Sequence, residues 1–330
     1  MNPPSLRPMS LGELLDHVFT LYRRHFTLFA GIAILPVAIG IGLSLLIQIA
    51  QRPLLLAQAE GAAAFAALLG ASVLAIFVFL AGFLALLVVF VVSLAAATHA
   101  VWSVTLGISP GIRAAYAAVR GKAARLVGLI LMIVLRIFGY MTLLGTLGAI
   151  LIALPAALLG NQVLTLTLTI VFIVLMITAM VVLSLRYSLA VPALVLEDAS
   201  ISGAIRRSIA LAHDFRWRIL LTYLLTLAIG YAAFFIFQMP FFLMTISHSL
   251  SGTTPPFWIG ALQAVSAGAS GLLTWPLTAI AFAALYLDIR VHKEALDLQV
   301  MMQSLDRQGA AGGDPGPPAP DPPPPGSLSL

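Results

Sequence analysis

Long apolar runs alternate along the chain with short segments in which polar and apolar residues follow helical spacing. About 20 apolar residues are enough for one helix to cross the 30 Å core of a bilayer. Six runs reach that length, at about 26–49, 61–107, 126–158, 165–191, 219–246 and 258–287. The pattern predicts an all-α integral membrane protein whose six transmembrane helices form three hairpins, each preceded by an amphipathic interfacial helix.

The most polar segment between two of these runs is 197–218. On a helix, Ile201 and Ile205 would lie on one side, and Arg206 and Arg207 on the other. Such a helix could lie on a membrane surface, with its apolar face at the acyl boundary and its guanidinium groups at lipid phosphates. A solvated basic loop between two spans is the alternative. The residues expected to bind anionic lipid are Arg23, Arg24, Arg206, Arg207, Arg216 and Arg218.

Three serines predict the starts of the amphipathic helices. Ser10 and Glu13 have the spacing of a capping box. Ser109 followed by Pro110 predicts a second start, with a capping side chain and a proline at the first helical position. With a third cap at Ser200, these starts indicate a threefold repeat near 10–105, 109–192 and 200–290.

The flanking segments have a different composition from this membrane domain of 10–305. The leader at 1–9 is too rich in proline for regular structure, and the tail at 306–330 contains the run PGPPAPDPPPPG. Such a tail is predicted to be disordered or polyproline, and a proline-binding module as its partner is the alternative. A signal peptide is the competing interpretation of the first run, but the preceding segment is too long and acidic for a usual n-region.

The distribution of positive charge predicts the topology. If each apolar run crosses once, 15 of the 17 lysines and arginines lie on one side of the membrane. The positive-inside rule then places both termini in the cytoplasm. A second pass within 61–107 would remove this asymmetry, so we expect one helix there.

Composition excludes several classes of protein. With 61% hydrophobic and 9% charged residues, the chain lies far outside the range of a soluble globule. The net charge of +5 is concentrated at the ends of apolar runs, where anionic headgroups rather than nucleic acid are the nearer partner. There is no cysteine, which excludes disulfides and thiolate chemistry, and no histidine spacing indicates a metal site or cofactor.

Arg136 is the charge that lies deepest within a predicted span. If that span begins at residue 126, Arg136 lies about 15 Å along the helix, where a charge usually marks a pathway or a buried pair. If 137–158 is the span instead, the side chain can extend to the interface. We favour the second interpretation.

Charged residues at the inner ends of the fourth and sixth spans are candidates for an ion-pair cluster. A catalytic carboxylate pair is the alternative, but equal numbers of arginines and acids favour structural pairing. The expected members are Arg186, Glu197, Asp288, Arg290 and Glu294.

Three stretches resemble a known family: LDHVFTLYRRHFTLFAGIAILP, LEDASISGAIRRSIALAHDFRWRI and PLTAIAFAALYLDIRVHKEALDL. They are similar to the membrane domain found on some bacterial glycerophosphoryl diester phosphodiesterases and to its stand-alone relatives, over about residues 5–300. The resemblance implies a six-span unit of the bacterial plasma membrane with no established chemistry. The phosphodiesterase barrel has no counterpart, because there is no His-Arg dipeptide and no stretch of about 250 residues to form it, so enzymatic activity is not implied.

Two functions from different classes therefore remain in view, and an intramembrane enzyme ranks behind both. The first is a non-catalytic scaffold that binds membrane phospholipids, and a membrane or cytoplasmic protein partner, at the cytoplasmic face. The second is a transporter or lipid translocator with a path through proline-kinked spans and Arg136. The scarcity of strongly polar residues in the spans favours the scaffold.

Overall fold

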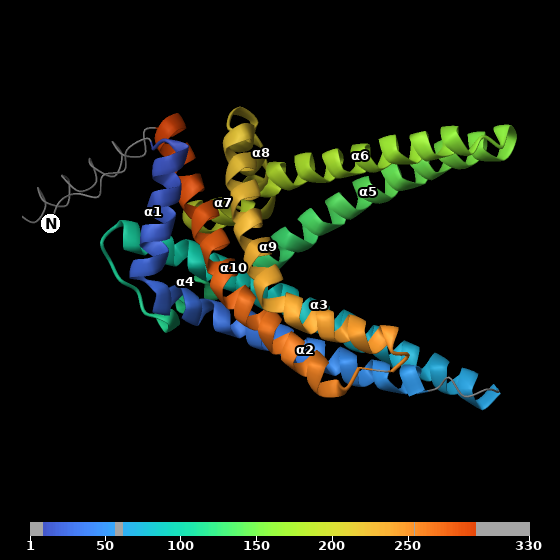
Figure 1. Ribbon diagram of the computed structural model, residues 1–330. Coiled ribbons are helices and arrows are strands. Elements are labelled where there is room, and N and C mark those ends of the chain that lie inside the picture. The colour runs from blue at the N-terminus through green and yellow to red at the C-terminus, as the bar shows by residue number, and fades with distance from the viewer. Residues whose placement is uncertain (1–8, 57–61, 254, 295–330) are drawn as a thin grey trace, which may run out of the picture.

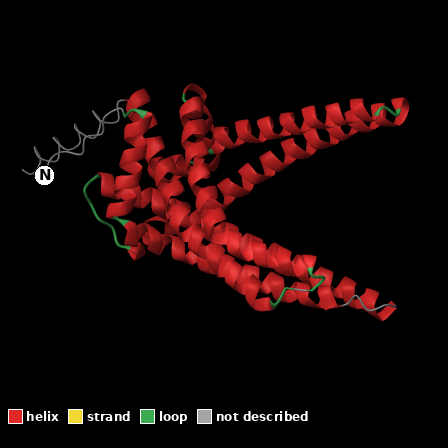
Figure 2. Cartoon of the chain, in the orientation of Figure 1, coloured by secondary structure: helices red, strands yellow, loops and turns green. Residues whose placement is uncertain are grey.

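The computed structural model describes residues 9–56, 62–253 and 255–294, and these are helical with short connections (Figure 2). No strand occurs within these ranges. The helices are α1 (Leu11–Arg24), α2 (Phe26–Leu56), α3 (Ala62–Thr105), α4 (Ile112–Arg120), α5 (Ala123–Leu159), α6 (Gln162–Tyr187), α7 (Ala190–Glu197), α8 (Ile201–Asp214), α9 (Arg216–Leu250) and α10 (Phe257–Glu294).

Six stretches of helix are long and apolar enough to cross a membrane, which confirms the predicted all-α fold with six spans. The second of them, Ile76–Thr105, lies within the single helix α3, so the apolar run at 61–107 contains one pass and not two. The fourth, Gln162–Glu197, is broken at residues 188–189 into α6 and α7, a break that the apolar pattern did not predict.

The spans form two arms that diverge from a common base (Figure 1). One arm is a bundle in which α10 packs against α2, α3 and α9, and α2 packs against α3. The other is the hairpin of α5 and α6, which pack against each other. The base contains the short helices α1, α4, α7 and α8 with the adjoining ends of the spans. Because α1 packs against α10, the described parts of both chain ends lie together at the base.

The hydrophobic core lies in the base and along α10. In the most apolar window of the span formed by α10, 67% is buried inside the protein. In the corresponding window of the span that contains α6, only 6% is buried. Large buried side chains of the core include Leu126, Ile205 and Tyr286. The α5–α6 hairpin instead exposes leucine, isoleucine and valine along much of its length, as expected of helices whose solvent is lipid.

Two of the three predicted helix starts are confirmed. Ser10 accepts a hydrogen bond from the Glu13 N–H, and Glu13 accepts one from the Ser10 N–H, so the capping box is complete. The Ser200 side chain caps α8 by accepting from the Gly203 N–H at 3.2 Å.

The start predicted at Ser109 is wrong. The helix α4 begins at Ile112, after Gly111, which makes no side-chain cap. The reason lies at the end of α3, where Gly107 adopts a left-handed φ of 81° and Ile108 donates to the Ser103 carbonyl. This Schellman-type ending leads into an extended segment, so the next helix begins later than its serine and proline indicate.

The amphipathic helices direct their apolar faces into the protein. Leu14 and Val18 of α1 are buried, and this helix packs on α10. Ala204, Ile205 and Leu211 of α8 are buried against α5, α6 and α7. The expectation that the apolar face of 201–214 sinks into lipid is therefore corrected, because other helices of the same chain cover that face.

Candidate functional site

Glu197, at the end of α7, is the centre of one polar cluster in the base. The Nε atom of Arg207 donates to both of its carboxylate oxygens, at 3.2 and 3.1 Å. The hydroxyl of Tyr286 donates to the same carboxylate, and Nε of Arg290 lies 3.5 Å from it. The three partners come from α8 and α10, so this cluster joins α7 to two other helices.

The chain turns sharply after Glu197, which brings Arg207 back to it. Asp198 ends α7 in the left-handed conformation, with a φ of 52°. Its carboxylate lies 3.3 Å from Nζ of Lys122 and 2.9 Å from a guanidinium nitrogen of Arg125. Lys122, first as a hydrogen-bond donor and then as a charge, lowers the pKa of Asp198, and Arg125 adds to the effect. Segments 73 residues apart in the sequence are thus fixed beside each other.

Ser208 fills the break between α6 and α7. Its hydroxyl donates to the Arg186 carbonyl at 2.7 Å and accepts from the Leu189 N–H at 3.2 Å. These two backbone groups would otherwise lose partners where the helix is interrupted. Ser208 is fully buried, so α8 supplies the polar group that the break requires.

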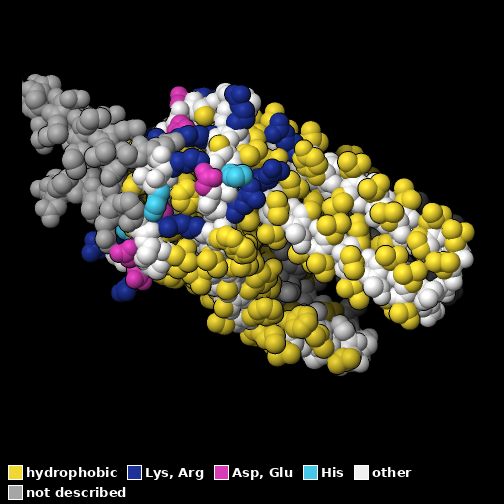
Figure 3. Space-filling view, turned by 90° about the horizontal axis from the view of Figure 1, so that it is seen from above, with side chains coloured by type: hydrophobic (Ala, Val, Ile, Leu, Met, Phe, Trp, Pro, Cys, Tyr) yellow, Lys and Arg dark blue, Asp and Glu magenta, His cyan; other side chains and the backbone are white. Residues whose placement is uncertain are grey.

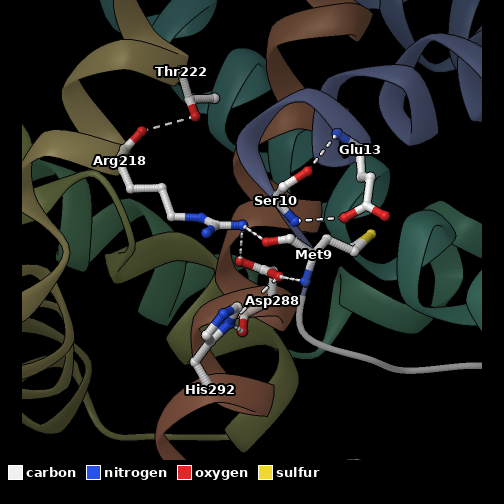
Figure 4. Close-up of polar contacts among 7 residues, drawn as sticks. All are labelled: Met9, Ser10, Glu13, Arg218, Thr222, Asp288 and His292. Atoms are coloured by element: carbon white, nitrogen blue, oxygen red, sulfur yellow. Dashed lines mark hydrogen bonds and ion pairs between the residues drawn. The ribbon is translucent and has the colours of Figure 1, made fainter.

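Asp288 is the centre of a second cluster (Figure 4). Its side chain is fully buried, and a carboxylate oxygen lies 2.7 Å from a guanidinium nitrogen of Arg218. The other oxygen accepts from the Met9 N–H at 3.0 Å, and Arg218 also donates to the Met9 carbonyl. The His292 ring lies near the same carboxylate, at 3.5 Å. This cluster ties the segment before α1 to α9 and α10.

Helical periodicity explains why α10 serves both clusters. Tyr286 and Arg290 are four residues apart and share the face toward Glu197. Asp288 and His292 are also four apart and lie on a different face, toward Arg218. About two turns of α10 therefore connect α7 and α8 on one side with α9 and the segment before α1 on the other.

Three of the five residues of the predicted ion-pair cluster take part in ion pairs in the base. Glu197, Asp288 and Arg290 are brought into the base network, although in two groups. The side chain of Arg186 is exposed and makes no ion pair with a described residue, and its backbone carbonyl accepts from Ser208. The side chain of Glu294 lies outside the described residues. The sequence reasoning missed Tyr286 and Met9, whose roles depend on which elements meet and have no signature in the local pattern.

The six arginines expected to bind lipid divide into two sets. Arg207 and Arg218 are engaged with Glu197 and Asp288, so their assignment to lipid is corrected. The remaining side chains are exposed and have no carboxylate partner among the described residues. Trp217, 76% exposed, lies beside one of them. Lysines and arginines gather at the base end of the molecule, and hydrophobic side chains cover the arms (Figure 3). The exposed set is Arg23, Arg24, Arg206 and Arg216.

Arg136 is exposed on α5 and makes no ion pair within the described part of the chain. The helix begins at Ala123, so Arg136 lies about 20 Å along its axis, and the residues beyond it still extend about 35 Å to Leu159. That length is enough to cross a bilayer without Arg136. The geometry agrees with a side chain that extends to the interface.

A further ion pair lies at the surface of the base. Nζ of Lys293 is 2.6 Å from the Asp214 carboxylate and also donates to the Ala210 carbonyl. Hydrogen bonding to Lys293, then to His213, lowers the pKa of Asp214 to about 2. Within the described ranges, no group of three or more histidines and acids is placed to hold a metal ion.

Comparisons with known proteins add no family to this picture. No family model, no curated protein and no solved structure matches the chain. The resemblance to the phosphodiesterase membrane domain therefore rests on the three quoted stretches, and it stays a prediction.

Proposed function

We propose that the protein is a non-catalytic membrane scaffold whose charged base binds anionic phospholipid through Arg23, Arg24, Arg206 and Arg216. The observation that carries the proposal is the division of the arginines into two sets. Glu197 and Asp288 engage the inner arginines in the core of the base, whereas the outer four are exposed and unpaired among the described residues.

The location of these four side chains favours a lipid partner. Arg216 begins α9, which continues into a span, and Trp217 beside it is largely exposed. Tryptophan with arginine at the start of a span is typical of the membrane–water interface. Each basic side chain near an anionic leaflet contributes about 1 kcal/mol, so four of them would favour anionic lipid strongly.

The polar clusters support a scaffold more than an enzyme. Both central carboxylates are bound by arginines from other helices, which suits a rigid platform on which a membrane or cytoplasmic protein could assemble. We further propose that the chain belongs with the stand-alone phosphodiesterase membrane domains and has its base in the cytoplasm of a bacterial cell. The three resembling stretches and the charge asymmetry of the sequence support this assignment.

The test is lipid selectivity after reconstitution in phosphatidylcholine vesicles. Spin-labelled phosphatidylglycerol should associate with the full chain more strongly than spin-labelled phosphatidylcholine, and the preference should weaken with salt. Replacing the four arginines by glutamine should reduce the preference by about fivefold for each arginine removed. Arg136→Gln, an exposed arginine outside the set, is the matched control. A preference for phosphatidylglycerol that remains after all four arginines are replaced would contradict the proposal.

A second measurement separates the scaffold from a translocator. Vesicles that contain the protein and a fluorescent phospholipid are treated with an impermeant quencher, which reports lipid flipping. The scaffold predicts no protein-dependent flipping. Flipping that is lost in Arg136→Ala would contradict the scaffold and identify Arg136 as a pathway residue.

A further inference from the structure

A second group of polar residues lies at the end of the bundle arm opposite the base. Here the last turns of α2 and α9 meet the beginning of α10 around a pocket of about 560 Å³ (Figure 1 shows the arrangement of these helices). That volume is within the range of small-molecule sites. Three glutamines from three different helices contribute to its lining, namely Gln48, Gln238 and Gln263.

Gln238 is the residue that points to a ligand. Its side chain is only 7% exposed, and its Oε1 atom is buried without a hydrogen-bond partner. Its Nε2 atom donates to the Gln263 carbonyl at 3.3 Å. Turning the amide over would place two oxygens against each other, so this hydrogen bond fixes the orientation. A residue that lines the pocket, in a membrane-spanning segment, therefore carries a strong acceptor that lacks a donor.

The lining indicates the charge of the ligand. Among the residues whose side chains the structure describes, those that line the pocket with polar groups are glutamine, serine and threonine, and none is charged. A charged ligand would meet no counter-ion among these residues, and burying an unpaired charge is costly. An uncharged molecule with hydroxyl or amide donors satisfies Gln238 without that cost.

An apolar pocket continues from this site along α10. It has a volume of about 290 Å³ and shares Ser44, Ala264 and Ala267 with the polar pocket. It extends past Gly268 and Gly271 to Trp275. A polar end joined to an apolar groove is the arrangement expected for an amphipathic ligand.

Gly260 keeps the polar pocket in its present form. A Cβ atom on this residue would lie 1.9 Å from Oε1 of Gln48, so only glycine allows that side chain to reach α10. Gln48 then donates to the Gly260 carbonyl at 3.1 Å. The two glutamines on α2 and α9 are thus bonded to backbone carbonyls about one turn apart on α10.

We propose that this pocket binds the uncharged, hydrogen-bond-donating headgroup of an amphipathic lipid, whose chain occupies the adjoining apolar pocket. Gln238 accepts a hydrogen bond from the headgroup, and α10 supplies the surface along which the chain lies. The site is separate from the exposed arginines of the base, so it extends the function beyond binding of anionic lipid.

The test uses a monoacylglycerol that carries a photoreactive diazirine in its acyl chain, with the full chain reconstituted in phosphatidylcholine vesicles. Labelled peptides are identified by mass spectrometry. We expect labelling within α2 and α10, at residues 36–48 and 260–275. A lysophosphatidic acid with the same photoreactive chain should label these segments at least fivefold less, because its headgroup is charged.

Substitutions identify the residue responsible. Gln238→Leu should lower labelling by roughly fivefold, the effect of one hydrogen bond. Gln162→Leu, at the exposed start of α6, is the matched control and should label as the parent protein does. Gly260→Ala should also lower labelling, because it displaces Gln48.

Thermal unfolding without probe excludes a purely structural role. Gln238→Leu removes only the long hydrogen bond from Nε2 to the Gln263 carbonyl, because Oε1 has no partner, so the variant should unfold at nearly the same temperature as the parent protein. Loss of the cooperative unfolding transition in this variant would make the glutamine structural and would overturn the proposal. Equal labelling of Gln238→Leu and the parent, or of the charged and uncharged probes, would also overturn it.

Discussion

The charged base and the α5–α6 hairpin are stabilised by different interactions. In the base, polar groups far apart in the sequence bind each other, as Arg218 does with Asp288 and Tyr286 with Glu197. In the hairpin, threonine hydroxyls such as that of Thr167 bond to a carbonyl of their own helix, four residues earlier. The two helices meet where Gly148 lies against the ring of Phe172.

This difference follows from the side chains of each region. The base holds much of the buried core and most of the charged side chains, so hydrophobic burial and paired charges both contribute to its stability. Lipid surrounds the hairpin, where burying a leucine gains little, and close packing at small residues replaces the hydrophobic effect. The stability of the base should therefore depend on its polar side chains. The stability of the hairpin should depend on the size of the side chains where its two helices meet.

The largest effect should come from the buried ion pair of the base. Asp288→Ala leaves the charge of Arg218 uncompensated in the core, which should lower the free energy of unfolding by about 3–5 kcal/mol. Denaturation by SDS in mixed micelles would measure it. Asp16→Ala, on the exposed side of α1, is the control and should change little. Equal stability of the two variants would show that the base does not depend on its charges.

A smaller effect is expected where the hairpin joins the base. Ser208→Ala removes the hydroxyl that bridges Arg186 and Leu189, leaving two backbone groups without partners at the break. The loss should be about 1–3 kcal/mol for an unsatisfied buried group. Hydrogen exchange should also become faster around residues 186–190. Ser202→Ala, an exposed serine of the same helix, should leave exchange there unchanged.

The close contact between α5 and α6 should determine the stability of the hairpin. In Gly148→Ala, the new Cβ would lie 1.9 Å from the Phe172 ring, so the ring or the helices must move. Overpacking of this kind costs about 1–3 kcal/mol. A distance measurement between spin labels on α5 and α6 would detect their separation. Gly145→Ala on the same helix meets nothing within 4 Å and should be neutral; similar behaviour of the two variants would remove shape as the cause.

The smallest effect concerns the surface pair of Lys293 and Asp214. The pKa of Asp214 is lowered from 3.8 to about 2, so its contribution is complete above pH 3.8 and is lost as the pH falls toward 2. Because the group is exposed, screening should keep the change in stability small. In Lys293→Gln, an NMR titration should find the pKa of Asp214 raised toward 3.8. An unchanged pKa would mean that Lys293 does not hold the carboxylate.

The sequence was sufficient for the spans and for two of the caps, because these depend on local composition. Run length predicted six spans, and the serine–glutamate spacing predicted the start of α1. It was not sufficient for the pairing of Arg207 and Arg218, because an arginine bound to lipid and one bound to a carboxylate have the same helical pattern. Only the packing of α8 against α7 and of α9 against α10 distinguishes them.

The break after α6 has a local signal that the apolar pattern does not contain. Pro192, the third residue of α7, has no N–H to donate to the Ser188 carbonyl, so a continuous helix is disfavoured through residues 188–189. The partner that makes the break tolerable, Ser208, lies 19 residues beyond Leu189 on another helix. The amphipathic pattern of 201–214 was detected, but whether lipid or protein covers its apolar face is decided by tertiary structure.

The divergence of the two arms fixes how the protein can sit in a bilayer. Two arms that spread from one base cannot both be parallel to the membrane normal, so at least one crosses at a tilt (Figure 1). A tilted helix needs a longer apolar stretch to cross the same thickness. The part of α5 beyond Arg136 extends about 35 Å, slightly more than a 30 Å core. This excess allows the hairpin to tilt, so the thickness of the surrounding bilayer acts on the spread between the arms.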